Sequence, residues 1–315
     1  DTGTYALTVN LLVTADDAGV TIEGPAGPGH AAVLDRGNTA SGSYTIELTD
    51  ADGVTLRHLT AAGGYHGVYV ADDSDGVTVE SCLLRDNARR GLYAPSGNDA
   101  LTVSSCTARD NGYEGILVDG AEAVLVANTV HDNGGAGIDA GGANAHVLEN
   151  TAYANNSYGL SVAGAAAVVQ DNTAFHNQSH GMYASGDVLV SGNTAYGHTN
   201  SSGIYVSSGA RAIGNVAYDN ETGLSANYGA DLEGNRAHHN SEAGLWINYG
   251  GDATGNVAYD NETGLIGGSQ FSGAVANNRL YDNTTWGLHL YSVDGPTVRN
   301  NTVLQPTGNA VHVDT

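Results

Sequence analysis

The sequence predicts an all-β fold: a single-stranded, right-handed parallel β-helix of about twelve coils with an N-terminal cap. A segment of about 20 to 24 residues recurs along most of the chain, and "GNVAYDNETGL" begins at both Gly214 and Gly255. Short stretches alternate polar and apolar residues between Gly, Asn and Asp turns, and helical periodicity is absent. Because the repeat has no leucine ladder, it indicates stacked β-coils rather than a leucine-rich repeat.

Each predicted coil closes on a glycine that precedes an apolar residue. These column glycines are Gly67, Gly91, Gly115, Gly137, Gly159, Gly181, Gly203, Gly223, Gly244, Gly264 and Gly287. Ala310 takes this place in the last coil. Residues 1–51 break the period, so we expect them to form the N-terminal cap with the first irregular coils. Residues 52–315 then form the β-helix of the same domain, whose open end such a cap covers.

Asparagine recurs at two positions of the repeat. The first ladder contains Asn128, Asn150, Asn172, Asn193, Asn215, Asn235, Asn256, Asn278 and Asn301. The second ladder contains Asn87, Asn111, Asn133, Asn155, Asn177, Asn220, Asn240, Asn261 and Asn283. A buried asparagine at a turn can bond the coils on both sides, so we expect both ladders to be structural. Cys82 and Cys106 continue the first ladder, where parallel side chains favour two buried thiols over a disulfide.

The charge balance restricts the partners. The chain has 34 acidic residues against ten basic ones, all arginine, and its formal net charge is −24. Nucleic acids and anionic membranes require clustered cations, so we expect neither as a partner. The sequence contains no run of 18 apolar residues, so it predicts no membrane-spanning helix. This composition is typical of a secreted or salt-adapted protein, and we expect an extracellular or cell-surface monomer.

One outward face of the coils is rich in aromatic side chains and histidine. Period-2 geometry directs the second residue after each column glycine, the +2 column, toward solvent, together with the fourth. The residues of this face that we expect to bind sugar rings are Tyr69, Tyr183, Tyr205, Trp246, His289 and Tyr291. The alternative is that these rings stack on each other and only stabilise the sheet.

A second aromatic column lies within the repeated "N-x-A-Y-D-N". Its members are Arg85, Arg109, His131, Tyr153, Phe175, Tyr196, Tyr218, His238, Tyr259 and Tyr281. The regularity of this column favours a stacking ladder between coils over a binding site.

Ionisable groups gather on the coils between residues 66 and 139. If the chain is catalytic, we expect Arg90 to bind a uronate carboxylate while Tyr93 or His66 acts as base or acid. Asp119 and Asp139 would position sugar or calcium, and as neighbouring carboxylates they also fit the pair of a glycoside hydrolase. The alternative is charge pairing on a solvated surface.

Calcium is the cofactor that acidic turns predict. In "ADDSDG", Asp72, Asp73 and Asp75 offer carboxylates in a turn that a glycine ends. The full calcium-binding loop of twelve residues is absent, and such a turn also forms without metal.

The coils "NTAYANNSYGLSV" and "NTAFHNQSHGMYA" resemble those of right-handed parallel β-helix proteins, especially the catalytic modules of bacterial mannuronan C5-epimerases and related polysaccharide lyases. The resemblance covers about residues 76–310 and implies a secreted, calcium-linked enzyme that acts on alginate. In the frame "GIDAGG", Asp139 matches the aspartate of the epimerases' Asp-Pro-His motif, whereas Gly141 stands at the histidine. The chain also has no lysine to match the family's lysine.

These observations predict a protein that binds or acts on polysaccharide, with acidic polymers favoured over neutral ones. If it is catalytic, we expect a polyuronate lyase or a C5-epimerase-like enzyme. The alternative is a structural or adhesion module of a larger surface protein, without chemistry of its own. The near-perfect repetition favours the module, and the aromatic face and the arginine cluster favour the polysaccharide protein.

Overall fold

The computed structural model describes residues 2–27, 31–71 and 73–314, and strands dominate it throughout. The chain forms two compact units, Asp1–Ala167 (unit 1) and Val168–Thr315 (unit 2). In each unit the strands lie in three parallel sheets, A, B and C, which the chain visits in turn. The one helical turn among the described residues is the 3-10 helix η1 (Ala15–Asp17).

In unit 1, sheets A and B have seven strands each and sheet C has six. Sheet A contains β1 (Gly3–Ala6), β4 (Ala32–Asp35), β7 (Leu59–Ala62), β10 (Leu83–Arg85), β13 (Thr107–Arg109), β16 (Thr129–His131) and β19 (Thr151–Tyr153). Sheet B contains β2 (Leu11–Thr14), β5 (Ile46–Thr49), β8 (Val68–Ala71), β11 (Leu92–Ala94), β14 (Ile116–Val118), β17 (Ile138–Ala140) and β20 (Leu160–Val162). Sheet C contains β3 (Thr21–Glu23), β6 (Thr55–Arg57), β9 (Thr78–Glu80), β12 (Thr102–Ser104), β15 (Val124–Val126) and β18 (His146–Leu148).

Unit 2 repeats the same order. Sheet A contains β22 (Thr173–Phe175), β25 (Thr194–Tyr196), β28 (Val216–Tyr218), β31 (Arg236–His238), β34 (Val257–Tyr259), β37 (Arg279–Tyr281) and β40 (Thr302–Leu304). Sheet B contains β23 (Met182–Ser185), β26 (Ser202–Ser207), β29 (Thr222–Asn227), β32 (Ala243–Ile247), β35 (Thr263–Gly267), β38 (Trp286–Leu290) and β41 (Asn309–Val313). Sheet C contains β21 (Val168–Gln170), β24 (Leu189–Ser191), β27 (Arg211–Ile213), β30 (Asp231–Glu233), β33 (Ala253–Thr254), β36 (Ala274–Ala276) and β39 (Thr297–Arg299).

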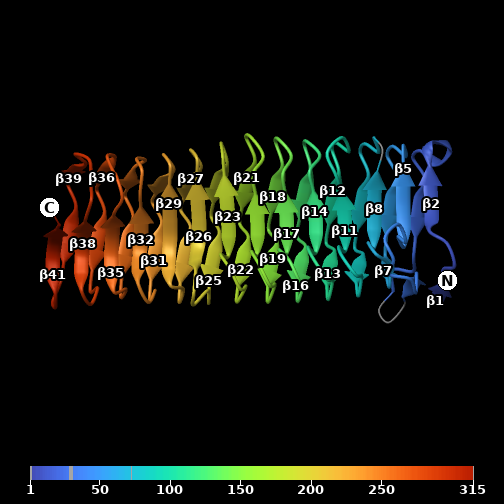
Figure 1. Cartoon of the computed structure of the whole chain (residues 1–315), viewed down its shortest axis with the longest axis horizontal. Helices are drawn as coiled ribbons and strands as arrows, with labels where there is room; N and C mark the ends of the chain where they lie inside the picture. Colours follow the sequence, from blue (N-terminus) through green and yellow to red (C-terminus); the bar gives the residue numbers. More distant parts are fainter. Residues whose placement is uncertain (1, 28–30, 72, 315) are drawn as a thin grey trace. The chain divides into compact units, whose positions relative to one another are not determined.

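Within each unit, strands pair in parallel with the strand one coil earlier and one coil later (Figure 1). The predicted parallel β-solenoid is therefore confirmed. Strands β1, β2 and β3 already pair with β4, β5 and β6, so the coils begin within the first 51 residues. Among the described residues no helix is long and apolar enough to cross a membrane.

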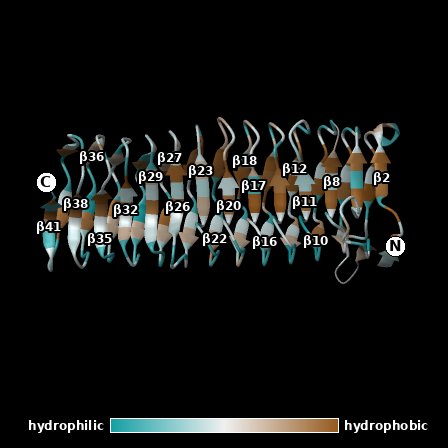
Figure 2. Ribbon diagram, viewed as in Figure 1, coloured by the Kyte–Doolittle hydropathy of each residue, from teal (hydrophilic) through white to brown (hydrophobic). Residues whose placement is uncertain are grey.

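The core is a column of small aliphatic side chains inside the three sheets. Val, Leu, Ile and Ala fill the inward positions, as at Leu92, Ile116 and Ile138 of neighbouring sheet B strands. In Figure 2 the hydrophobic colour lies mainly on strands, most clearly in unit 1, and the visible strands of unit 2 are paler. Parallel pairing keeps the inward positions in register, so the apolar side chains of one coil stack on those of the next.

The turns explain the repeated sequence letters. In "GNVAYDN", Gly214 and Asp219 both adopt left-handed backbone conformations, with φ of 64° and 55°. Each is followed by a buried asparagine, Asn215 or Asn220, on either side of strand β28. Glycine and aspartate are tolerated in this conformation better than most residues, so the "G-N" and "D-N" pairs mark the two bends that flank sheet A.

Both predicted asparagine ladders are present. Asn235 Nδ2, for example, donates to Ala212 O at 2.9 Å and to Asn256 Oδ1 at 3.0 Å, and Asn215 repeats this pattern one coil earlier. Cys82 and Cys106 are buried and free, and the Cys82 backbone N–H donates to Cys106 Sγ at 3.4 Å. The expectation of two buried thiols is therefore confirmed.

The second ladder changes residue type twice within unit 2. His198 takes the place of an asparagine and contacts Asn177 and Asn220. Gln305 ends the ladder by accepting the Asn283 backbone N–H at 3.0 Å. The buried His198 was not foreseen, because its coil interrupts the "D-N" pair with "G-H".

The predicted aromatic stacking ladder is also present on sheet A. In unit 2, Tyr196, Tyr218 and His238 stack with ring centroids 4.9 and 5.2 Å apart and nearly parallel planes. His238, Tyr259 and Tyr281 continue the stack at 4.9 and 5.0 Å. These spacings match the distance between neighbouring strands, so the rings stabilise the sheet rather than form a separate site.

Candidate functional site

Ionisable side chains meet on sheet B of unit 1. Strands β11, β14 and β17 succeed one another on sheet B (Figure 1). They place Tyr93, Leu117 and Asp139 in register, and Ser161 of β20 follows Asp139. These residues form the +2 column on the outward face. Arg90 and Glu114 each precede a column glycine and lie beside this column. We call Arg90, Tyr93, Glu114, Asp119 and Asp139 the carboxylate–arginine site.

Arg90 organises this site. Its Nε donates to Glu114 Oε2 at 2.6 Å, and both side chains are less than one-fifth exposed. Its guanidinium carbon lies 4.5 Å from the centroid of the Tyr93 ring, within cation–π range. A half-buried ion pair that also covers a tyrosine ring holds the guanidinium in one place, as substrate positioning requires.

The two aspartates of the site hold their protons more tightly than usual. Burial raises the pKa of Asp139 to about 6, and the charges of Glu114 and Asp119 add to this rise. A hydrogen bond from Ser161 and the charge of Arg90 oppose it. Partial burial likewise raises the pKa of Asp119, against the lowering effect of Arg90. Asp139 can therefore exchange a proton near neutral pH, which an ordinary aspartate cannot.

Gly141 makes room for one of these carboxylates. A Cβ at Gly141 would lie only 2.5 Å from Asp119 Oδ1. The position at which the epimerase motif has histidine is therefore covered here by an aspartate from the neighbouring coil. The site has three carboxylates and one guanidinium, and no imidazole reaches this point from residue 141.

His66 lies deeper, inside an aromatic cluster. It is 3% exposed, and its ring lies 5.2 Å from that of Tyr93 and 5.9 Å from that of Tyr69. Its Nδ1 accepts the Arg90 backbone N–H at 3.3 Å. Burial lowers the pKa of His66 to about 4, and the charges of Arg90 and Arg89 add to this effect. His66 is thus a neutral group at neutral pH, and its Nδ1 holds the backbone of Arg90 by a hydrogen bond.

The loop that the sequence predicts to bind calcium has other contacts. Asp72 lies outside the described residues, and Asp73 is exposed with φ of 63°. Asp75 Oδ1 accepts the Asp99 backbone N–H at 2.7 Å, and its own N–H donates to Asp52 Oδ1 at 2.9 Å. Asp75 therefore belongs to a chain of aspartates that satisfies loop backbone groups from coil to coil, and calcium stays a prediction.

Unit 2 carries a cleft beside Trp246 on its sheet B. The cleft has a volume of about 420 Å³ and is lined by hydroxyl, amide, carboxylate and imidazole groups. Trp246 lies between Ser225 and Ile266 in register, so no aromatic ring stacks on it among the described residues. Its Nε1 donates to Asn248 Oδ1 at 3.2 Å. A tryptophan face beside amides and carboxylates is suited to a sugar ring.

The floor of this cleft holds a serine–histidine pair and a carboxylate. Ser201 Oγ lies 2.8 Å from His180 Nδ1, which also accepts the Ser202 backbone N–H at 3.1 Å. Burial lowers the pKa of His180, which favours its neutral form. Burial, together with the charges of Glu221 and Glu262, raises the pKa of Glu242.

Most other predicted sugar-binding rings cover each other. Tyr69 and Tyr93 stack with centroids 5.5 Å apart, and Tyr183 and Tyr205 stack at 5.6 Å. Stacked rings present edges rather than flat faces to solvent, so Trp246 is better placed than they are to receive a sugar ring.

The two predicted residues near the end of unit 2 lie on and beside β38. His289 is buried and contacts Asp314, and its ring lies 5.3 Å from that of Tyr291. The Tyr291 ring passes over Gly268, where a Cβ would meet it at 2.8 Å. Burial raises the pKa of Tyr291, and a hydrogen bond with the neighbouring Trp246 opposes this rise in part.

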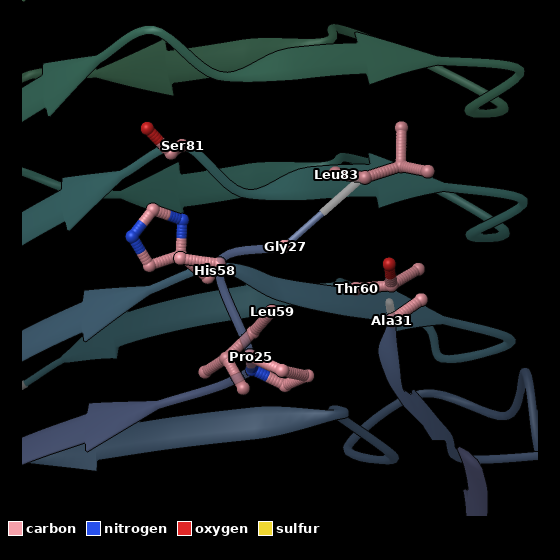
Figure 3. Close-up of a pocket in the computed structure, with 9 residues that line it drawn as sticks. Pro25, Gly27, Ala31, His58, Leu59, Thr60, Ser81 and Leu83 are labelled. Carbon is pink, nitrogen blue, oxygen red and sulfur yellow. The ribbon is translucent and has the colours of Figure 1, made fainter. Parts of the chain in front are cut away.

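A further pocket of about 300 Å³ lies in unit 1 beside β7 and β10. Its lining includes Pro25, Leu59, Leu83 and His58, with the hydroxyls of Thr60 and Ser81 (Figure 3). Among the described residues that line this pocket, His58 alone has an ionisable side chain, so the pocket offers less chemistry than the carboxylate–arginine site.

Sequence reasoning named His66 and Arg90 singly but missed the column to which they belong, which directly precedes the column glycines. His66, Arg90, Glu114, His180 and Trp286 all belong to it, and each lies beside a +2 side chain on sheet B. Its variability was a usable signal, because a purely structural column would repeat one residue type as the asparagine ladders do.

Comparison with known proteins agrees with this architecture. A family model described as "Right handed beta helix region" matches residues 13–152, 95–232, 140–284 and 182–315, which together cover nearly the whole chain. The chain belongs to the right-handed β-helix family. This assignment confirms the predicted resemblance to right-handed β-helix proteins. No curated protein sequence matches the chain significantly.

Solved structures with this fold include two polysaccharide epimerases and a tailspike protein. The Azotobacter vinelandii mannuronan C-5 epimerase AlgE4 A-module superposes with a TM-score of 0.62 at 17% identity, over 100% of this chain and 89% of that one. The Dettilon tailspike protein gp208 gives 0.58 at 13% identity, over 99% and 61%. A mutant of the periplasmic alginate epimerase AlgG gives 0.53 at 14% identity, over 96% and 78%. At these identities the likeness establishes the β-helix fold alone.

Proposed function

We propose that this β-helix protein acts on a polysaccharide, and that Asp139 of the carboxylate–arginine site transfers the proton. The observation that carries the proposal is the convergence of Asp139, Asp119 and Glu114 on the single guanidinium of Arg90 on an outward sheet face. General acid–base catalysis works best when the pKa of the group lies near the working pH, and that of Asp139 is about 6. The solved carbohydrate enzymes with this fold support the substrate class.

Two reactions use such a group, and the charge of the site separates them. C5-proton abstraction from a uronate needs a cation for the substrate carboxylate, and Arg90 stacked on Tyr93 is the available one. However, Glu114 already pairs with Arg90, and two further carboxylates lie nearby. An acidic polymer then needs a protonated Asp139 or an added cation, whereas cleavage of a neutral glycosidic bond needs only the acid and its partner carboxylate. We therefore rank glycosidic cleavage first and uronate chemistry second.

Time-resolved proton NMR tests both kinds of reaction, because one spectrum reports the products of each. The protein is mixed with neutral glucans, polymannuronate, polyguluronate and polygalacturonate, with and without calcium. New anomeric reducing-end signals report hydrolysis, an olefinic proton reports elimination, and changed C5 couplings report epimerisation. Asp139→Asn should slow the reaction by about 100-fold or more, because an amide can neither donate nor accept the transferred proton as a carboxyl group does. The exposed carboxylate of Asp187 serves as control, and Asp187→Asn should leave the rate unchanged.

Unchanged spectra on every polymer would contradict a catalytic role. The chain would then be a binding or structural module, and affinity for oligosaccharides should depend on Trp246 in the unit 2 cleft. The proposal includes an extracellular or cell-surface location, which the strongly acidic composition favours.

A further inference from the structure

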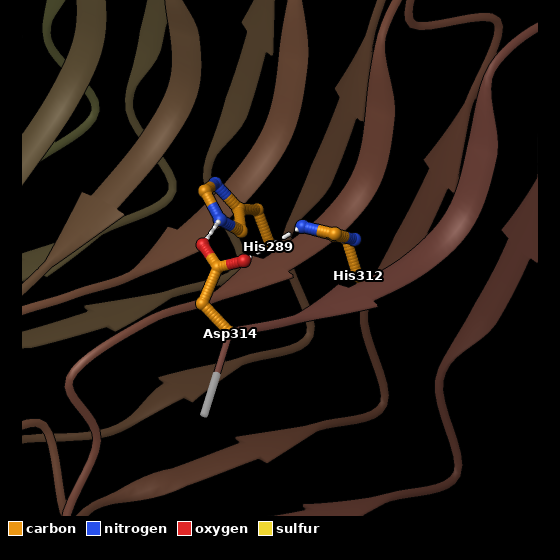
Figure 4. A group of neighbouring side chains, drawn as sticks. All are labelled: His289, His312 and Asp314. Atoms are coloured by element: carbon orange, nitrogen blue, oxygen red, sulfur yellow. Dashed lines mark hydrogen bonds and ion pairs between the residues drawn. The ribbon is translucent and has the colours of Figure 1, made fainter.

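The two last coils of unit 2 bring two imidazoles and a carboxylate together. Strands β38 and β41 are parallel neighbours in which His289 pairs with His312. The two imidazoles therefore project from the same face one coil apart. Asp314 follows His312 by two residues, so period-2 geometry returns its side chain to that face. Figure 4 shows the three side chains pointing toward each other, and we call them the His–His–Asp triad.

The ligand atoms of this triad have the spacing of a metal site. His289 Nε2 lies 2.8 Å from Asp314 Oδ2, and His312 Nε2 lies 2.8 Å from Asp314 Oδ1. One nitrogen from each histidine and one carboxylate oxygen all lie within 4.8 Å of one another. A tetrahedral ion with bonds of about 2 Å sets its ligand atoms roughly 3.3 Å apart. Small side-chain rotations are enough to reach this spacing.

Aromatic rings hold both imidazoles in place. The Trp286 ring stacks on His312 at 5.2 Å with an interplanar angle of 8°, and it lies 4.3 Å from the His289 ring. Tyr291, which follows His289 in the sequence, packs on the His289 ring with the two ring centroids 5.3 Å apart. Because His289 is buried, with 9% of its surface exposed, its ring has little freedom to turn away. Ligands on packed strands lose less freedom on binding than ligands on loops.

We propose that the His–His–Asp triad binds one divalent transition-metal ion, zinc in the first place, through both Nε2 atoms and one oxygen of Asp314. Imidazole with carboxylate is a preferred ligand set for zinc, whereas calcium prefers oxygen ligands alone. In the metal-free arrangement the imidazole N–H groups donate to the carboxylate. On binding, each Nε2 presents its lone pair, so each neutral ring carries its proton on Nδ1. The half-exposed side of His312 and Asp314 leaves a coordination position for water or another ligand.

Calorimetric titration of the chelator-treated full chain with zinc chloride tests the site, and the cobalt(II) absorption spectrum reports its geometry. We expect one zinc ion per chain and a cobalt spectrum typical of tetrahedral coordination. His312→Ala and Asp314→Asn should each weaken zinc binding by about 100-fold or more, because each removes one of three ligands. These two residues are chosen because they lie nearer the surface than the buried His289.

The control variant is His146→Ala, which removes an exposed strand histidine from β18 of unit 1. It should leave the zinc affinity unchanged, and an excess of calcium should not displace zinc. Absence of zinc binding to the folded wild-type chain would overturn the proposal. Zinc binding that survives in both His312→Ala and Asp314→Asn would overturn it as well, because the ion would then lie on other histidines of the chain.

Discussion

His198 is one of two residues at which the second ladder of unit 2 departs from asparagine, and it is the buried one. Its Nδ1 lies 2.9 Å from Asn220 Oδ1, an acceptor, so Nδ1 carries the proton. Its Nε2 lies 3.3 Å from Asn177 Nδ2, a donor, and therefore accepts. The contact with Asn177 requires the neutral ring, because a protonated imidazole has no acceptor nitrogen. Burial lowers the pKa of His198 to about 4, with His176 and His180 adding to the effect and the bond to Asn220 opposing it.

This tautomer makes part of the stability pH-dependent. The folded-state pKa lies below the unfolded value of about 6.5, so the contribution of His198 is complete above pH 6.5 and is lost as the pH falls toward 4. His198→Asn should therefore reduce the loss of unfolding free energy between pH 7.5 and pH 5 by about 2 kcal/mol. Urea denaturation at the two pH values measures this difference.

Exposed His146 again provides the control, and His146→Ala should keep the pH dependence of the parent chain. An unchanged pH dependence in His198→Asn would show that the ring accepts a proton without cost in the folded state.

Asp139 and Gly141 show where single residues resist prediction. The sequence frame directed attention to Asp139, because period-2 geometry fixes the direction of its side chain. It could not show that Asp119 fills the space above Gly141, since that contact depends on a side-chain rotation between coils. The raised pKa of Asp139 also follows from burial that no single-coil pattern reports.

At the scale of the elements, the asparagine ladders join the coils through their turns. Asn235 accepts from the Asn215 backbone N–H and Nδ2, and donates to Ala212 O and Asn256 Oδ1. Removing this amide takes a hydrogen-bond partner from buried donors and acceptors on the two flanking coils, and each buried group left unpaired costs about 1 to 3 kcal/mol. We expect Asn235→Ala to lower the free energy of unfolding by at least about 3 kcal/mol.

Chemical denaturation of Asn235→Ala and of a surface variant measures this effect. Asn156 is exposed in a turn of unit 1, and Asn156→Ala should change the free energy by less than about 0.5 kcal/mol. Equal losses in both variants would mean that the ladder adds nothing beyond ordinary turn propensity.

The elements were predictable where one residue type repeats in every coil. The ladders, the sheet A stack and the parallel coils follow from such columns, because parallel pairing places like on like. The sheet B surface was harder to predict. Periodicity shows that Tyr69, Tyr93, Tyr183 and Tyr205 point outward, but not that neighbouring rings cover their faces. Trp246, by contrast, lies between the non-aromatic Ser225 and Ile266 on the neighbouring strands.

The whole molecule carries far more negative than positive charge. Its formal charge is −24, and the solenoid stacks equivalent carboxylates on successive coils. In unit 2, the Glu242 backbone N–H donates to Glu221 O and the Thr263 N–H to Glu242 O, so Glu221, Glu242 and Glu262 succeed one another along the coils. The neighbouring charges help raise the pKa of Glu242, which means that the ionised column is under repulsion.

This repulsion predicts a protein that salt stabilises. The Debye length falls from about 30 Å at 0.01 M salt to about 3 Å at 1 M, so salt screens the carboxylates from one another. We expect the melting temperature to rise by several degrees between 0.05 and 1 M sodium chloride at pH 7.5. Glu242→Gln should raise the low-salt melting temperature and reduce the salt dependence, because it removes the middle charge of the column.

Thermal unfolding of both proteins across the salt series measures this prediction, with Gln178→Glu, which adds a carboxylate at an exposed position of unit 2, as the opposite change. Gln178→Glu should lower the low-salt melting temperature, if by less, because it lies outside the column of three carboxylates. Sucrose in place of salt separates screening from general exclusion at the surface, since sucrose stabilises compact states without screening charge. If salt and sucrose raised the melting temperature of wild type and Glu242→Gln equally, charge repulsion would not limit the stability of this fold.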